Sequence, residues 1–152
     1  MAGVHFGETR GAVLERLGPP TRMTIASGTR SWYTLWYLDG PYAGLEVHFI
    51  ENLGEDFNAS PADYYVMDYP FRGTTAEGIG IGSKKTQLFT VYGQPLNAVA
   101  GARVRADGTT YETTVYQYCL GRRQIQYRVT TDTVAAMYYG YHGEPLMAIP
   151  CA

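Results

Sequence analysis

The sequence predicts an α+β fold made of two tandem helix-strand-strand-strand repeats, whose antiparallel sheets carry the helices on one face. Three observations predict it: an internal similarity between the two halves, a short helix signal at the start of each half, and tyrosine-rich alternating segments after each helix. The 152 residues include 14 tyrosines, a residue type that favours half-buried pleated surfaces. A chain of this length suits one domain that buries roughly 70% of its unfolded surface.

The internal similarity relates residues 3–20 to residues 78–95 at a shift of 75. The coincident glycines and prolines are Gly3, Gly7, Gly18 and Pro20 with Gly78, Gly82, Gly93 and Pro95. After a five-residue insertion the similarity resumes between residues 28–49 and 108–129 at a shift of 80. We interpret residues 1–152 as one pseudo-symmetric domain made of repeat 1 (3–69), linker 70–77 and repeat 2 (78–141). Chance similarity in a chain rich in glycine and tyrosine is the alternative.

Each repeat begins with a short helix. Thr9 and Ser83 are candidate N-caps, and Gly18 and Gly93, each soon followed by proline, are typical helix stops. Such short helices form only when an apolar edge packs on other elements. The segments that alternate like strands are 31–38, 45–50 and 63–69 in the first half, and 111–120, 123–129 and 134–141 in the second.

The segment GIGIGSKK, residues 78–85, looks like a phosphate-binding loop. It lacks the GxxxxGK[ST] spacing, and its third glycine comes one residue early for the GxGxxG pattern of dinucleotide sites. The matching segment of the first repeat keeps the apolar residues but replaces Gly80 by His5 and the two lysines by Thr9 and Arg10. We therefore expect backbone geometry to explain these glycines, with phosphate binding at the following helix as the alternative.

The pattern of G[IV]x[IF]G, a helix, a glycine stop, a Gly-Thr turn and two strands with Trp or Tyr resembles the tandem-repeat fold of the β-lactamase-inhibitor proteins. It is also similar to the SmpA/OmlA (BamE-like) outer-membrane lipoproteins, which use one such unit. The resemblance covers residues 3–141. It implies a non-enzymatic periplasmic or secreted protein that grips a partner protein with an aromatic sheet face. The chain departs from the inhibitors in having two cysteines, whereas they have a disulfide in each unit.

Strand alternation divides the side chains between two faces. If Leu45, Val47 and Phe49 point toward the helices, Glu46 and His48 point the other way. The same reasoning, with the shift of 80 applied to the second half, gives an open face with six candidate partner-binding residues. These are Trp32, Trp36, Tyr116, Tyr118, His48 and Arg128. The alternative is that these rings cover the sheet through cross-strand pairs or pack against the other repeat.

Catalytic and metal-binding patterns are scarce. The three histidines lie far apart in the sequence, no HxxxH or CxxC pair is present, and no serine sits in a GxSxG elbow. His48 beside Glu46 is the one acid–base pair at side-chain spacing on a strand. We therefore expect no enzyme activity, no cofactor and no metal. The alternative is a small-molecule-binding or hydrolytic domain, with His48, Arg128 and tyrosines meeting in a cleft between the repeats.

Charge and hydropathy limit the classes of partner that the sequence predicts. The net charge is −2 and the basic residues are scattered, so we expect an unidentified protein partner and no nucleic acid. No apolar run approaches the ~20 residues that span a bilayer, although a leader segment that tethers the protein to a membrane is compatible with this N-terminus. Cys119 and Cys151 permit one disulfide, yet two cysteines fit a reducing compartment equally well.

Overall fold

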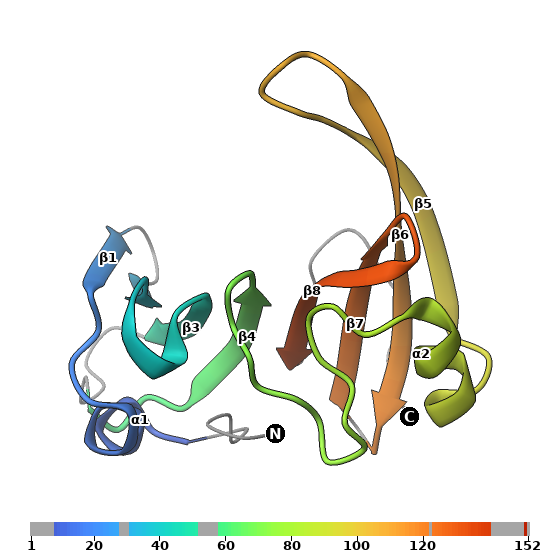
Figure 1. The fold of residues 1–152 in the computed structure, drawn as a ribbon. Coiled ribbons are helices and arrows are strands. Elements are labelled where there is room, and N and C mark those ends of the chain that lie inside the picture. The colour runs from blue at the N-terminus through green and yellow to red at the C-terminus, as the bar shows by residue number, and fades with distance from the viewer. Residues whose placement is uncertain (1–7, 28–30, 52–57, 122, 141–150, 152) are drawn as a thin grey trace.

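The protein is built around one antiparallel sheet of eight strands (Figure 1). The computed structural model describes residues 8–27, 31–51, 58–121, 123–140 and 151. The strands are β1 (Arg22–Ser27), β2 (Ser31–Tyr37), β3 (Leu45–Glu51), β4 (Ala62–Asp68), β5 (Asn97–Val104), β6 (Thr110–Leu120), β7 (Arg123–Thr130) and β8 (Thr133–Gly140). The helices are α1 (Arg10–Leu17), α2 (Lys85–Tyr92) and a short 3₁₀ turn, η1 (Gly40–Tyr42). The strand order is β1-β2-β3-β4-β8-β7-β6-β5.

The predicted α+β class, with two helix-strand-strand-strand repeats and helices packed on one face, is wrong. The chain is mainly β, because its two α-helices have only eight residues each and β4 pairs with β8 to join both halves into one sheet. Each half also has a fourth strand, β1 or β5. The sequence of β5, NAVAGARV, is rich in Ala and Gly, which are depleted in strands, and its ladder with β6 overrides that preference.

The two halves are arranged alike around the β4–β8 junction. A helix precedes four strands in each half, and the strand order runs outward from the junction to β1 on one side and β5 on the other. A twofold axis through the junction, perpendicular to the sheet, would produce this order. One contact occurs in both halves: Tyr37 donates its hydroxyl to the Gly18 carbonyl and Tyr118 to the Gly93 carbonyl, each at 3.0 Å. The duplication of residues 3–69 and 78–141 stays a prediction.

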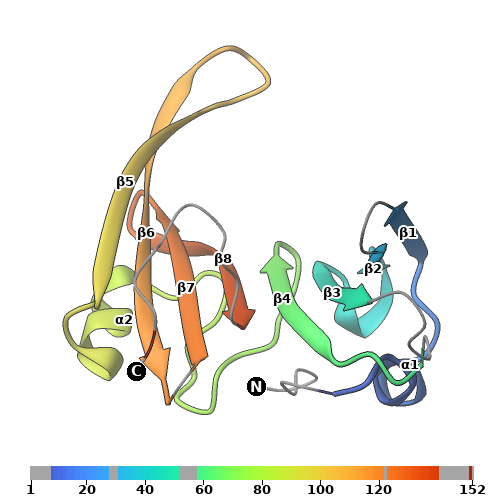
Figure 2. The same cartoon turned by 180° about the vertical axis from the view of Figure 1, so that it is seen from behind.

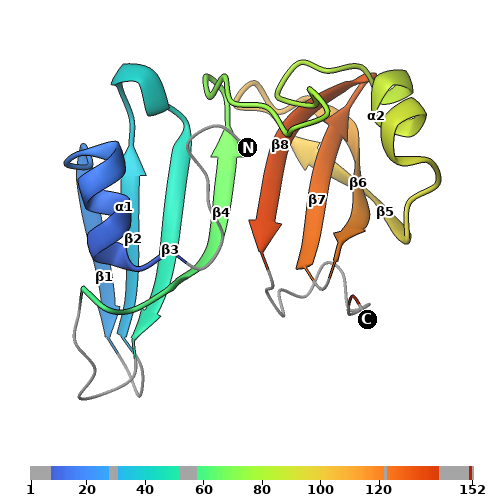
Figure 3. The same ribbon diagram turned by 90° about the horizontal axis from the view of Figure 1, so that it is seen from below.

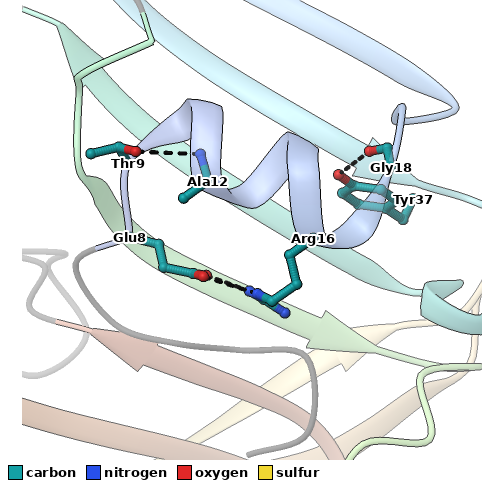
Figure 4. Close-up of polar contacts among 6 residues, drawn as sticks. All are labelled: Glu8, Thr9, Ala12, Arg16, Gly18 and Tyr37. Carbon is teal, nitrogen blue, oxygen red and sulfur yellow. Dashed lines mark hydrogen bonds and ion pairs between the residues drawn. The ribbon is translucent and has the colours of Figure 1, made fainter.

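The helix ends follow the sequence signals in most respects. Thr9 caps α1 by accepting a hydrogen bond from the Ala12 amide at 3.3 Å, and Glu8, which precedes the helix, forms an ion pair with Arg16 in its last turn (Figure 4). Gly18 and Gly93 end α1 and α2, as predicted. The predicted cap Ser83 instead accepts from the Gly80 amide, and the Gln87 side chain accepts from the Lys84 amide at the start of α2.

One hydrophobic core spans both halves. Its members include Val13 and Leu17 of α1, Leu88 of α2, Phe71 and Ile79 of the segment between the halves, and strand residues of both halves. We call the side of the sheet that holds Leu35, Val47, Tyr65, Met137 and Tyr127 the core face, and the opposite side the open face. Figure 3 shows α1 lying against the β1–β3 end of the sheet.

Candidate functional site

The open face follows from strand register, because alternate residues of a strand point to opposite sides. Cross-strand partners then carry the assignment from strand to strand. Its members on the central strands and on β1 include Arg22, Thr24, Trp32, Thr34, Trp36, Glu46, His48, Tyr64, Val66, Asp68, Gln126, Arg128 and Tyr138. Trp32 is 44% exposed. Of the six predicted binding residues, the structure places Trp32, Trp36, His48 and Arg128 on this face.

Trp36 is held in place by two neighbours on β1. Its indole Nε1 donates to Thr24 Oγ1 at 2.9 Å, and the Arg22 guanidinium lies 4.8 Å from the centroid of the Trp36 ring. A cation over an indole face is attracted by the ring quadrupole. The β1 edge therefore presents an ordered pair of an arginine and a tryptophan, which the sequence did not reveal because β1 was not predicted as a strand.

His48 is the centre of a second cluster. Its ring stacks on Tyr64 with a centroid distance of 4.1 Å and an angle of 8° between the planes. Its Nε2 lies 3.1 Å from Glu46 Oε2 and its Nδ1 lies 3.1 Å from Thr34 Oγ1. Both ring nitrogens are thus engaged by neighbouring side chains, so the ring is fixed in orientation. Tyr64 could have been found from the alternation of residues 63–69.

Arg128 makes its contacts farther along the same face. Its guanidinium donates to the Tyr138 hydroxyl at 3.1 Å and lies 3.6 Å from Asp68 Oδ2. Its strand, β7, is separated from β3 by β4 and β8, which corresponds to about 14 Å across the sheet at the usual strand spacing. His48 and Arg128 therefore share the open face without meeting in one site.

The prediction that Tyr116 and Tyr118 share the open face is wrong. Tyr118 is 5% exposed and packs against Tyr92 and Tyr127, with centroid distances of 5.3 and 6.0 Å. Tyr116 meets Phe89 of α2 edge-on at 5.2 Å. Both rings point to the core face.

A one-residue register error explains this result. Leu45 of β3 and Ile125 of β7 are 80 positions apart in the sequence, as predicted. Their cross-strand partners, Tyr37 of β2 and Tyr118 of β6, are 81 positions apart. A shift of one residue sends every side chain of a strand to the other face. The open-face residues of β6 are therefore Val115, Gln117 and Cys119.

The open face of the second half carries amides and a disulfide. Gln117 is fully buried and donates from Nε2 to Gln124 Oε1 at 2.9 Å, and Gln126 is also buried. Cys119 is bonded to Cys151, a pairing that the sequence left open. The aromatic part of the open face therefore lies on β2, β3, β4 and β8.

The tyrosines of the core face make stability sensitive to high pH. Burial raises the pKa of Tyr37 and Tyr118 to about 12, and it raises the pKa values of Tyr65 and Tyr127 as well. Above the ordinary tyrosine pKa of about 10, the unfolded chain loses these phenolic protons while the folded chain keeps them. The contribution of these tyrosines to the free energy of unfolding is thus intact below pH 10 and is lost as the pH rises from 10 through 12.

We expect the free energy of unfolding, measured by denaturant titration, to fall between pH 10 and pH 12. The Tyr118→Phe variant removes one titrating group and should lose less stability over this interval than the wild type. Tyr69 is 79% exposed, so Tyr69→Phe serves as the control and should show the wild-type loss. An equal loss in all three proteins would mean that burial of Tyr118 does not cause the pH dependence.

The lysines of residues 78–85 lie beside a cavity of about 520 Å³, lined by Lys84, Lys85, Thr86, Thr131, Asp132 and Thr133. The first amides of α2 are already engaged, since Lys84 donates to the Gln87 side chain and Lys85 donates to the Asp132 carbonyl at 2.7 Å. A Cβ on Gly80 would lie 2.8 Å from the Gly73 carbonyl oxygen. Close backbone packing thus explains Gly80, and the Lys84 and Lys85 amides already have partners within the chain.

Among the residues that the structure describes, no three His, Cys, Asp or Glu side chains gather to hold a metal ion. No helix in the described part of the chain is long and apolar enough to span a membrane. Comparison with protein-family models, curated proteins and solved structures finds no match to this chain.

Proposed function

We propose that this chain is a non-enzymatic protein-binding module of the bacterial envelope or the secreted space, which binds a partner protein through the aromatic part of its open face. The observation that carries the proposal is the exposed Trp32 on the same face as Trp36, His48 and Tyr64. Trp, Tyr and Arg dominate the energetics of protein interfaces.

Preorganisation supports a binding role. Trp36 is fixed by Thr24 and Arg22, and His48 is fixed by Tyr64 and by hydrogen bonds to two neighbours. Side chains that are ordered before binding lose little conformational entropy when a partner arrives. The face also presents both signs of charge, since Arg22 is positive and Asp68 is negative. This combination suits a partner surface of mixed polarity.

The disulfide supports the proposed location in the envelope or the secreted space. Disulfides persist in oxidising compartments such as the periplasm and the exterior, and Cys119 is bonded to Cys151. The resemblance to the β-lactamase-inhibitor proteins and the SmpA/OmlA lipoproteins points to the same compartments and stays a prediction. The alternative of a small-molecule or hydrolytic site is less favoured, because His48 and Arg128 do not converge.

The proposal is tested with Trp32→Ala and a matched control, Ile25→Ala. Ile25 lies on the neighbouring strand, is 55% exposed and pairs with Tyr33, so its side chain points to the core face. A partner captured by the wild type from secreted or envelope fractions is purified, and its Kd is measured for each variant. We expect Trp32→Ala to weaken binding at least tenfold and Ile25→Ala to change it less than twofold.

Two results would contradict the proposal. In one, Trp32→Ala binds the partner as tightly as the wild type. In the other, Ile25→Ala weakens binding as much as Trp32→Ala does. Circular dichroism of each variant separates lost binding from lost folding.

A further inference from the structure

The outer edge of β5, one arm of a long hairpin, has no neighbouring strand among the residues that the structure describes. β5 is the last strand of the sheet, and Figures 1 and 2 show it rising with β6 beyond the other strands. β6 pairs with β7 only from Thr113 onward, so residues 102–112 form a two-stranded ribbon. Edge strands present backbone groups that can pair with another chain.

The outward groups of β5 follow from the ladder alternation. Arg105 donates its amide to the Thr109 carbonyl at 2.7 Å, so in an antiparallel ladder the odd-numbered residues of β5 bond to β6 and the even-numbered ones point outward. The Ala98 amide fits this pattern, since it donates to the side chain of Asn97 at 2.9 Å. Within the described residues, Ala100, Ala102 and Val104 then have outward amides and carbonyls without a strand partner.

β5 has few of the features that usually protect such an edge, and Arg103 is its one charged residue. Natural edges carry proline, lysine or a bulge, whereas NAVAGARV has neither residue and its eight pairs with β6 run without a register shift. The residues that bear the outward groups are Ala98, Ala100, Ala102 and Val104, whose small side chains leave room for a close strand. Val104, the last residue of β5, is 69% exposed, and Leu96, the residue just before β5, is 47% exposed.

We propose that β5 pairs antiparallel with β5 of a second copy of this chain, about a twofold axis at Gly101 and perpendicular to the sheet. In this register Ala100 exchanges backbone hydrogen bonds with Ala102 of the second copy, and Ala98 lies opposite Val104. The two Gly101 residues meet at a non-hydrogen-bonded position, where the Cα atoms of neighbouring strands come closest, at about 4.5 Å. At the centre of the proposed pair, small side chains thus face small side chains, so the two strands can approach closely.

Charge favours this antiparallel pairing with a second copy. Arg103 is the charged residue of β5, and in this register it lies opposite Val99 of the second copy. The two Arg103 positions are then four residues apart, about 13 Å along the strands, which exceeds the screening length of about 8 Å at physiological salt. A parallel pairing in register would place the two arginines directly opposite each other, about 5 Å apart.

The dimer would form a sixteen-stranded sheet with both open faces on the same side, because the axis is perpendicular to the sheet. A partner with two binding surfaces would gain affinity from such a bivalent arrangement. Edge pairing itself does not depend on the proposed function.

The test compares two alanine-to-proline variants on the same hairpin. Ala100→Pro removes an outward amide and leaves the ladder with β6 intact, which edge strands tolerate. Ala106→Pro lies in the turn in which the Gly108 amide donates to the Arg105 carbonyl, at the second turn position, where proline is favoured. We expect sedimentation to give twice the 16.8 kDa chain mass for the wild type and Ala106→Pro, and a single chain for Ala100→Pro.

A wild-type protein that stays monomeric up to about 10⁻⁴ M, where even a weak dimer would form, overturns the proposal, as does an Ala100→Pro variant that still dimerises. Hydrogen exchange of the wild type provides a second measurement that needs no variant. The amides of Ala100 and Ala102 should exchange more slowly as protein concentration rises. Exchange that is equally fast at every concentration also overturns the proposal.

Discussion

The Gly44→Ala variant is expected to lose about 3 kcal/mol or more of its free energy of unfolding, because both the backbone conformation and close packing exclude a side chain there. Gly44 has φ of +89°, a region that costs residues with a Cβ about 1–2 kcal/mol. A Cβ would also lie 2.2 Å from the Asp68 carbonyl oxygen and 2.7 Å from the Phe71 amide nitrogen. These neighbours are backbone atoms, so relief requires movement of the turn after β4.

Gly40→Ala is the matched control for this variant. Gly40 has φ of +70° in the same connection between β2 and β3, but no heavy atom lies within 4 Å of a Cβ placed on it. It should therefore show only the conformational cost of about 1–2 kcal/mol. Denaturant unfolding of both variants measures the difference. Equal losses would contradict the close approach of Gly44 to the end of β4.

Loss of the disulfide is expected to have the next largest effect. The bond closes a loop with a sequence separation of 32 residues, for which loop-closure entropy gives about 3 to 4 kcal/mol. We therefore expect Cys119→Ser to lower the midpoint of thermal unfolding markedly. Since the same bond is lost in Cys151→Ser, the two single variants and the double variant should be equally stable.

A reducing agent provides the control for this prediction. Dithiothreitol should lower the unfolding midpoint of the wild type to that of Cys119→Ser and should leave that variant unchanged. A wild-type protein whose stability does not respond to reduction would show that the bond contributes nothing to stability. It would also weaken the case for an oxidising compartment.

Local signals in the sequence predicted the individual elements well. Gly18 and Gly93 marked the helix ends, and alternation located β2, β3, β4, β6, β7 and β8 near their observed positions. The strands β1 and β5 were missed because their residues have weak strand preference and depend on a neighbouring strand. The pairing of β4 with β8 is a contact between segments about 70 residues apart, and no local pattern reveals it.

The predicted open face matches the structure at Trp32, Trp36, His48 and Arg128 but not at Tyr116 and Tyr118. Alternation along β2 and β3 correctly assigned Trp32, Trp36 and His48 to one side of the sheet. The assignment of Tyr116 and Tyr118 used the same shift for both strand pairs, although β6 is offset by one residue relative to β7. Periodicity shows which residues of one strand share a face. The register between two strands depends instead on the lengths of their connections and on packing.

The central claim is that the aromatic part of the open face contacts a partner protein. Photocrosslinking tests it most directly, with a benzophenone side chain placed at position 32 in one protein and at position 25 in another. We predict a crosslink to the captured partner from position 32 and none from position 25. A crosslink from position 25 alone would place the partner on the other side of the sheet and would contradict the claim.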